Sequence, residues 1–265
     1  FLRRMTHPHN PRRMGKAIEK YPIVLLMKKF AMRAPKRPSQ FRVMSARVRA
    51  PRAGRDGNSR RPLPRVFYAR SSVRVARAVL GRVLIFDAPS GRAAGRIVEV
   101  EAYGGADDPA SHAHRGRTRR NAAMFAAPGH AYVYFSYGMH FCLNLVSATA
   151  GRPSAVLVRA LEPLEGLAGM RRRRGRVADA ALARGPGNLT RALGVTRRLD
   201  GADLVRGPLW VSNEAARRGG RRVVAGPRIG IRLARSRPWR FTLEAHPCAS
   251  GPRGRRPGRG VSLRR

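Results

Sequence analysis

The sequence predicts a single α+β domain with a largely antiparallel, curved β-sheet flanked by short helices. Three observations support this fold class. Short strand patterns and short helix patterns alternate along residues 66–250, which is typical of mixed domains. A turn signal at Pro89–Ser90–Gly91 joins two apolar runs, as in an antiparallel hairpin. Internal repeats, heptad runs and nucleotide-binding glycine motifs are absent from the sequence, which argues against solenoids, coiled coils and P-loop domains.

The first half of the domain contains one helix pattern followed by strand patterns. Residues 71–81 predict a helix, because Ser71 or Ser72 can cap its first turn and Gly81 can end it. Strands flank the 89–91 turn. Residues 121–127 predict one or two helical turns that end before a proline, and residues 155–160 predict a buried strand.

The second half mixes two helices with short strands. Pro163 predicts the start of a helix with core positions at Leu164, Leu167 and Ala168, and we interpret the basic end of this helix, residues 171–174, as a solvated face. A helix beginning near Asn188 follows two glycines, a geometry that can offer backbone N–H groups to a phosphate. Short strands are predicted around Trp210, 223–224, 229–233 and 240–243.

The two flanks differ from the domain in composition. Residues 1–65 predict a basic, disordered N-terminal extension, and residues 251–265 predict a basic, disordered tail. The apolar run at 21–27 is too short to span a bilayer. The extension can be an organelle transit peptide, a DNA-holding arm or sequence upstream of the natural start, because Met5, Met14 and Met44 are all candidate starts.

The charge of the chain indicates a polyanionic partner. The formal net charge is +42, and both the domain and its flanks contribute to this excess, as expected for nucleic-acid binding. The alternative is a compositional bias, since all Lys residues lie within the first 36 positions and every later cation is Arg. Cys142 and Cys248 have no metal-binding spacing, so we expect neither a zinc site nor a disulfide framework.

Residues 97–144 hold most of the candidate chemistry. Strict alternation over Ile97–Tyr103 predicts a strand with Glu99 and Glu101 on one face and small apolar residues on the other. In the later strand pattern Tyr132 and Tyr134 share a face, whereas Tyr137 falls out of phase before a glycine, as a turn residue would. The loop between the two strands is rich in Gly and Arg and holds His112, Arg115, Arg117, Arg119 and Arg120.

This combination suits the removal of a base from a nucleic acid. Guanidinium groups hold phosphates, aromatic faces stack on an unpaired base, and a carboxylate can activate a water against the bond to the sugar. Taken without other information, the same residues are more often a rim carboxylate paired with Arg and ordinary sheet aromatics.

Several motifs in order resemble the alkyladenine (3-methyladenine) DNA glycosylase family, from about Phe67 to about Ser250. They are EAYGGADDPASHAHRGRTRRNAAMF, GHAYVYFSYGMHFCLN, AVLVRALEPLEGL, ARGPGNLTRALGV and GPRIGI. The resemblance implies a monofunctional enzyme of base excision repair that flips alkylated or deaminated purines out of double-stranded DNA and hydrolyses their bond to the sugar. It implies no metal, no cofactor and a monomer. We therefore expect a bacterial cytoplasmic, nucleoid-associated protein, or a nuclear or organellar one in a eukaryote.

The resemblance also implies roles for single residues. Glu101 is the general base, and Arg159 supports the pocket and the water, the alternative being an ion pair of Arg159 with Glu162 or Glu165. Other implied residues are the base-enclosing Tyr103, His112 and Tyr134, the purine-discriminating Asn144, and the wedge Tyr137 that enters the duplex. By charge and position, Arg115, Arg117 and Arg120 are candidates for holding the DNA backbone.

Two features bear on the reaction and on rival functions. The domain has no lysine, which favours direct attack by water over a Schiff base. The principal alternative is a non-catalytic basic nucleic-acid-binding protein, which the composition favours but which has no use for a carboxylate among the cations. A sugar-processing glycosidase would need a second positioned carboxylate, for which Glu99 is the nearby candidate.

Overall fold

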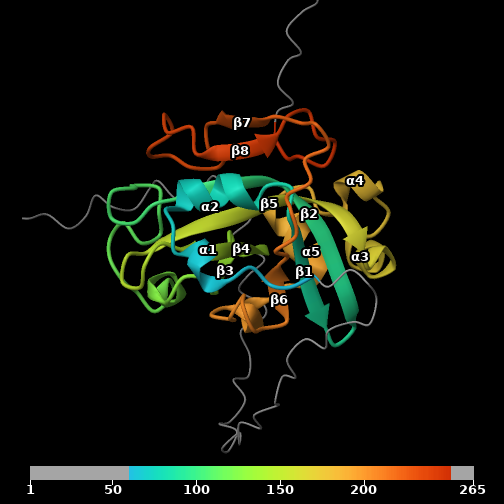
Figure 1. The fold of residues 1–265 in the computed structure, drawn as a ribbon, viewed down its shortest axis with the longest axis horizontal. Helices are drawn as coiled ribbons and strands as arrows, with labels where there is room; N and C mark the ends of the chain where they lie inside the picture. Colours follow the sequence, from blue (N-terminus) through green and yellow to red (C-terminus); the bar gives the residue numbers. More distant parts are fainter. Residues whose placement is uncertain (1–59, 252–265) are drawn as a thin grey trace, which may run out of the picture. The chain divides into compact units, whose positions relative to one another are not determined.

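The computed structural model describes residues 60–251, in which one antiparallel sheet is curled and partly covered by short helices (Figure 1). The strand order is β3-β4-β5-β2-β1-β6, and β8 pairs with both β2 and β7. The predicted α+β fold class is confirmed. The strands are β1 (Val83–Ala88), β2 (Gly91–Tyr103), β3 (Ala131–Ser136), β4 (His140–Ser147), β5 (Ser154–Glu165), β6 (Leu209–Val211), β7 (Val223–Gly226) and β8 (Arg240–Leu243).

The helices are short; two of them precede β1, and the others lie between strands in sequence. The side chain of Ser71 accepts a hydrogen bond from the backbone N–H of Arg74 and so caps α2, as predicted. The helix expected near Asn188 starts earlier, at Pro186, which fits the first helical position. The helices are α1 (Arg65–Tyr68), α2 (Ser72–Val79), η2 (Ala122–Phe125), α3 (Leu167–Arg174), α4 (Asp179–Leu182), α5 (Pro186–Leu193) and η3 (Arg197–Leu199).

Strand β2 is the longest strand and changes partner along one edge. Its first half pairs with β1 and its second half, Glu99–Glu101, pairs with β8, while β5 runs along the other edge. The pairing with β5 shifts on both sides of Glu99, as at a β-bulge. Because of this irregularity Ile97 packs in the same core as Val98, contrary to the strict alternation that the sequence predicts.

The two faces of the sheet have different chemistry. Val133, Leu145 and Val158 point to an apolar core that also contains the buried sides of α2, α3 and α5. Their neighbours in sequence point to the other face, as the two-residue period of a strand requires. The register places Tyr132, Asn144, Leu157 and Glu101 in one row across β3, β4, β5 and β2. This row is the floor of the site described below.

Two sequence predictions for the second half are wrong. Pro163 does not start a helix, because pairing with β2 extends β5 to Glu165; α3 begins at Leu167 after the left-handed Gly166, and its buried residue is Met170, not Ala168. Residues 229–233 form a loop and not a strand. The N–H of Ile229 donates to the side chain of Glu101 instead of to a neighbouring strand.

Residues before position 66, the predicted start of the domain, also contact the sheet. Leu63 is buried and its N–H donates to Val211 at 2.8 Å, and Pro62 bridges to Ser212. Residues 60–65, which the sequence assigns to the extension, therefore pack on the domain. The rest of the predicted extension and the predicted tail, from 252 on, lie outside the described residues.

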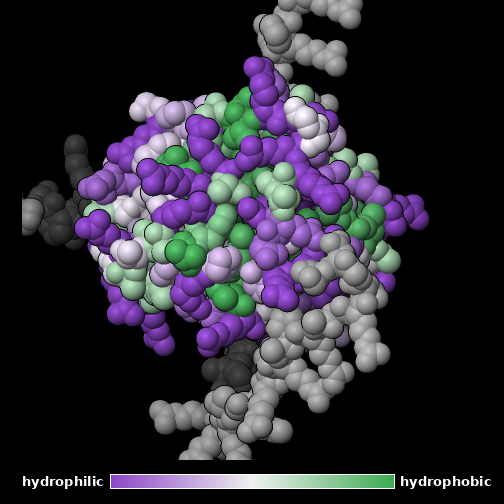
Figure 2. Space-filling view, in the orientation of Figure 1, coloured by the Kyte–Doolittle hydropathy of each residue, from purple (hydrophilic) through white to green (hydrophobic). Residues whose placement is uncertain are grey.

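The outer surface is mainly polar. Hydrophilic side chains cover most of the face shown in Figure 2, and smaller apolar areas lie between them. Within residues 60–251 we find no helix long and apolar enough to cross a membrane.

The packing of Leu63 can be tested by Leu63→Ala. Because this side chain is 3% exposed, the substitution should lower the free energy of unfolding by about 2–5 kcal/mol, measured by urea denaturation. Val66→Ala is the matched control, since Val66 is 72% exposed and should change stability by less than about 0.5 kcal/mol. Equal stability of the two variants would place Leu63 outside the core.

Candidate active site

A cavity of about 630 Å³ opens on the face of the sheet that carries the polar row. This volume suits a small planar ligand. Its walls come from four strands, the 104–121 loop and the loop between β7 and β8; lining side chains include Tyr103, His112, Tyr134, Tyr137, Asn144 and Arg159. With Arg120, which also lines it, the cavity brings seven of the predicted site residues to one place.

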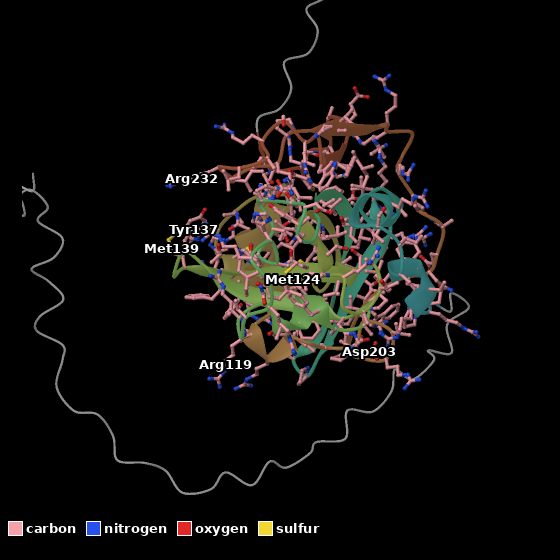
Figure 3. The ribbon with its side chains drawn as sticks, turned by 90° about the vertical axis from the view of Figure 1, so that its left-hand side faces the viewer. Arg119, Met124, Tyr137, Met139, Asp203 and Arg232 are labelled. Atoms are coloured by element: carbon pink, nitrogen blue, oxygen red, sulfur yellow. The ribbon has the colours of Figure 1, made fainter. Side chains whose placement is uncertain are left out.

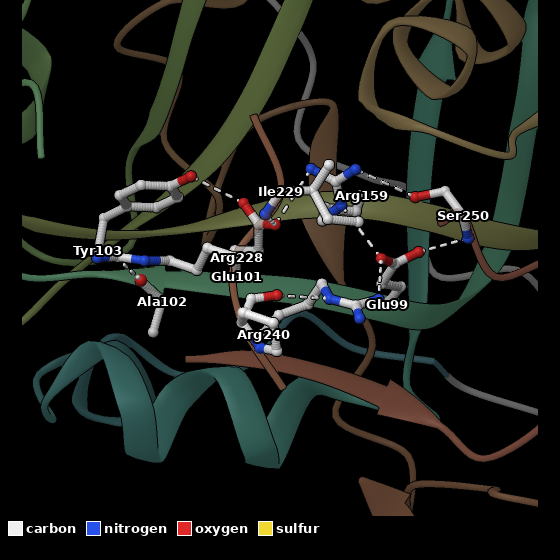
Figure 4. A network of polar contacts seen from close by, with 10 residues as sticks. Glu99, Glu101, Ala102, Tyr103, Arg159, Arg228, Ile229, Arg240 and Ser250 are labelled. Atoms are coloured by element: carbon white, nitrogen blue, oxygen red, sulfur yellow. Dashed lines mark hydrogen bonds and ion pairs between the residues drawn. The ribbon is translucent and has the colours of Figure 1, made fainter. Parts of the chain in front are cut away.

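Glu101 is fully buried directly behind the cavity wall. Its Oε2 accepts a hydrogen bond from the hydroxyl of Tyr103 at 2.7 Å, and its Oε1 accepts one from the N–H of Ile229 at 2.7 Å. Nη1 of Arg159 lies 3.2 Å from the same Oε1 (Figure 4). All three neighbours line the cavity. The carboxylate is therefore screened from solvent, and only these three residues separate it from a ligand in the cavity.

Glu99, also fully buried, holds the other side of Arg159. Nε of Arg159 donates to Oε1 of Glu99 at 3.1 Å, and Arg240 Nη1 donates to the same oxygen at 3.2 Å. The other oxygen accepts from the backbone N–H of Ser250. Every carboxylate oxygen of Glu99 is therefore engaged, as a buried charge requires.

The predicted alternative partners of Arg159 are wrong. Glu162 pairs with Arg96, and Glu165 pairs with Arg60. Both pairs lie further along β5, where Arg159 does not reach.

Aromatic rings form one wall of the cavity. The ring centroids of His112 and Tyr134 lie 4.5 Å apart in an edge-on arrangement, and those of Tyr132 and Tyr134 lie 5.3 Å apart. Nδ1 of His112 lies 2.9 Å from the hydroxyl oxygen of Tyr132. The sequence analysis missed the role of Tyr132 as partner of His112, although the alternation that groups it with Tyr134 was the available signal.

Burial keeps these groups uncharged. It raises the pKa of Tyr103, with further help from the negative charge of Glu101, and it raises the pKa of Tyr134 and of Tyr132, the last to about 12. Partial burial and the charge of Arg120 hold the pKa of His112 below its ordinary value. At neutral pH the wall therefore consists of neutral rings with hydroxyl and imidazole hydrogen-bonding groups.

Asn144 lies within strand β4, and Tyr137 lies in the turn that precedes it. Asn144 is buried in the polar row, and its amide donates to the carbonyl of Tyr132 at 3.1 Å. Tyr137 lies at the turn before β4, with φ of 49° followed by 66° at Gly138, and is 78% exposed at the side of the domain seen in Figure 3. Positive φ at both central residues is the hairpin geometry that the sequence indicated.

The predicted backbone-holding arginines divide into two groups. Arg120 lines the cavity, with Cζ 5.5 Å from the ring centroid of Tyr134. Arg115 and Arg117 are exposed in the same loop but are not among the lining residues.

A buried ion pair that the sequence analysis missed supports the wall. The guanidinium of Arg228 binds both oxygens of Asp108 at 2.6 and 2.8 Å and the carbonyl of Ala102 at 3.0 Å. Its Cζ lies 4.7 Å from the ring centroid of Tyr103. The pair thus joins the 104–110 loop, β2 and the segment before Ile229. In the sequence, only the GPRIGI motif, which contains Arg228, pointed to this segment.

Residues 60–251 contain no group of three or more His, Cys, Asp or Glu side chains placed to hold a metal ion. Cys142 and Cys248 are buried free thiols.

Comparison with known proteins identifies close relatives. The profile of the family described as methylpurine-DNA glycosylase matches residues 66–247. A protein of Burkholderia lata is 48% identical over 198 residues, which cover 73% of this chain and 93% of the relative. One of Methanocella arvoryzae is 48% identical over 193 residues, covering 71% and 95% respectively. Both relatives carry the provisional name 3-methyladenine DNA glycosylase.

The Arg228–Asp108 pair predicts a pH-dependent stability. Burial alone would raise the pKa of Asp108, but Arg228 and two backbone N–H groups hold it below the ordinary 3.8. Asp108→Asn should therefore destabilise the protein by about 3–5 kcal/mol above pH 5. The gap to the native protein should narrow as pH falls below 3.8, because the native carboxylate then becomes protonated.

Urea unfolding at several pH values measures this gap. The matched control is Asp179→Asn, which breaks an exposed pair with Arg171 and should leave the stability close to that of the native protein. A gap for Asp108→Asn that did not change with pH would contradict the assignment.

Proposed function

Because the chain belongs to the methylpurine-DNA glycosylase family, which makes it a DNA glycosylase, a hydrolase acting on DNA, we propose that it flips alkylated or deaminated purines into the cavity and excises them by water attack, leaving an abasic site. The observation that carries this proposal is the buried Glu101, whose three contacts all line an aromatic cavity. The role is that of a base excision repair enzyme.

Glu101 acts as the general base. A carboxylate oxygen can accept two hydrogen bonds, and Oε2 has one partner, Tyr103, so it keeps an acceptor position for the attacking water. The carboxylate also faces the positive charge that develops on the sugar as the bond breaks. Since Glu101 is screened from solvent, the water enters together with the substrate.

Arg159 orients this carboxylate without neutralising it fully. Its guanidinium is shared between Glu101 and Glu99, so two negative charges face one cation at this point. Arg240 supplies the second cation on the side of Glu99 only. The arrangement leaves Glu101 the more available acceptor of the two, which also argues against Glu99 as a second catalytic carboxylate.

The neutral rings of Tyr103, His112 and Tyr134 enclose the flipped base by stacking. We propose that the hydroxyl of Tyr132 donates to Nδ1 of His112, 2.9 Å away; the imidazole proton then lies on Nε2, and His112 is a donor to the base edge. Asn144 discriminates between purines at the floor, because its amide is fixed by the carbonyl of Tyr132.

Tyr137 fills the space that the flipped nucleotide leaves in the duplex, at a cost of about a few kcal/mol for the unstacked step. Arg115, Arg117 and Arg120 hold phosphates beside it. With no lysine from residue 37 to the end of the chain, the reaction proceeds without a Schiff base and without strand cleavage. We propose that the enzyme works as a monomer and needs no cofactor.

Glu101→Gln should abolish base release and spare DNA binding. The amide keeps the shape but cannot take a proton, so the single-turnover rate on duplexes with a central hypoxanthine or ethenoadenine should fall by at least about 100-fold. Alkaline cleavage of the abasic product measures the rate. Glu244→Gln is the matched control, because Glu244 lies in an exposed pair with Arg222. Cleavage by Glu101→Gln at the native rate would refute the assignment.

Tyr137→Ser should weaken binding to lesion-containing duplex more than to undamaged duplex. Removal of the exposed ring loses about 1–3 kcal/mol of stacking, which is a rise in Kd of about 5- to 160-fold, measured by fluorescence anisotropy. Val66→Ser removes an equally exposed apolar side chain from α1 and should leave binding unchanged.

Tight, salt-sensitive binding by the native protein without base release on any damaged duplex would instead indicate a non-catalytic binder.

A further inference from the structure

Exposed apolar side chains gather at the mouth of the cavity. Within the described residues, seven large apolar side chains are exposed. Two of them line the cavity, Tyr137 at the β3–β4 turn and Leu233 in the loop between β7 and β8, and a third, Met139, lies in the same turn as Tyr137. Leu233 is 57% exposed. On a surface rich in arginine, this concentration marks an interaction site.

The two segments lie on different rims. The β3–β4 turn belongs to the edge of the sheet, whereas the 229–237 loop leads into β8, which pairs with β2 beyond β4 and β5. Both nevertheless line the same cavity. Figure 3 shows Arg232 and Tyr137 projecting from the same side of the domain, so one ligand can contact both rims.

The base of the 229–237 loop is firmly anchored. The N–H of Ile229 donates to Glu101, and the carbonyl of Trp239 accepts from Ala102 at 2.8 Å. Arg237 donates to the carbonyl of Asp107 at 2.8 Å and lies 4.7 Å from the ring centroid of Trp239. Both ends of the loop are therefore fixed to β2 and to the 104–110 loop.

The tip of the loop, by contrast, is open to solvent. Arg232, Leu233 and Arg235 are exposed, and Ala234 adopts a left-handed φ of 51°. The carbonyl of Ala234 accepts from Arg228 at 3.5 Å and from the N–H of Arg237 at 3.3 Å. This conformation costs free energy in a non-glycine residue. Tyr137 on the other rim has it too, as do Ala148 and Ala245, which do not line the cavity.

We propose that the loop tip is a second contact with duplex DNA, in which Leu233 packs in the groove on the far side of the extruded nucleotide from Tyr137 and Arg232 holds a phosphate. The inference rests on the proposed function for its ligand. The ligand follows from the chemistry of the tip, since an apolar side chain between two arginines suits a groove floor between two phosphate strands. Gripping the duplex from both rims would hold the kinked state in which the nucleotide is extruded.

Leu233→Ala and Arg232→Ala test this contact, with a duplex carrying a central tetrahydrofuran abasic analogue as the probe. Leu233→Ala should raise Kd about tenfold without changing its salt dependence. Arg232→Ala should reduce the slope of log K against log salt by about 0.9. Both side chains are exposed, so equal melting temperatures will confirm that the variants fold.

The matched controls are Val224→Ala, an exposed apolar residue of β7, and Arg206→Ala, an exposed arginine, neither of which lines the cavity. Binding by Leu233→Ala equal to that of Val224→Ala would overturn the inference. Because the probe has no base to release, this result is independent of catalysis. Absence of base release by the native protein would refute the proposed function alone.

Discussion

The structure depends on the burial of two carboxylates, Glu99 and Glu101, on one strand. Neither is exposed, and an unpaired charge at such a depth costs several kcal/mol. Their partners come from far along the chain: Arg159 from β5, Ile229 from the loop between β7 and β8, and Ser250 from beyond β8. The C-terminal segment therefore completes the environment of the candidate base, and the reactive end of β2 takes its geometry only when the whole domain is folded.

The two carboxylates differ through their neighbours and not through their own chemistry. Glu99 contacts two arginines and a backbone N–H, whereas Glu101 contacts one arginine, a backbone N–H and a neutral hydroxyl. The more heavily neutralised carboxylate holds Arg159 in place. The less neutralised one keeps an acceptor position toward the cavity, which is what general-base catalysis requires.

Local pattern predicted what depends on local geometry. The period of two placed Glu101 and Tyr103 on one face, and the phase change at Tyr137 predicted its turn. Tertiary pairing decided the rest. Pro163 lies in a strand because its segment pairs with β2. Ile229 lies in a loop, where its N–H donates to the carboxylate of Glu101. The partners of Arg159 and Arg228 lie 60 and 120 positions away in the chain, a separation over which one sequence carries no pairing signal.

The arginines and the carboxylates of the described residues are distributed differently around the cavity and away from it. Away from the cavity, carboxylates such as Glu162, Asp179 and Glu244 each pair with an arginine. The residues that line the cavity include arginines but neither Asp nor Glu. Under the proposed function, a positive mouth would attract phosphates, and Glu101, which lies behind Tyr103 and Arg159, would keep its negative charge away from them until a base has entered.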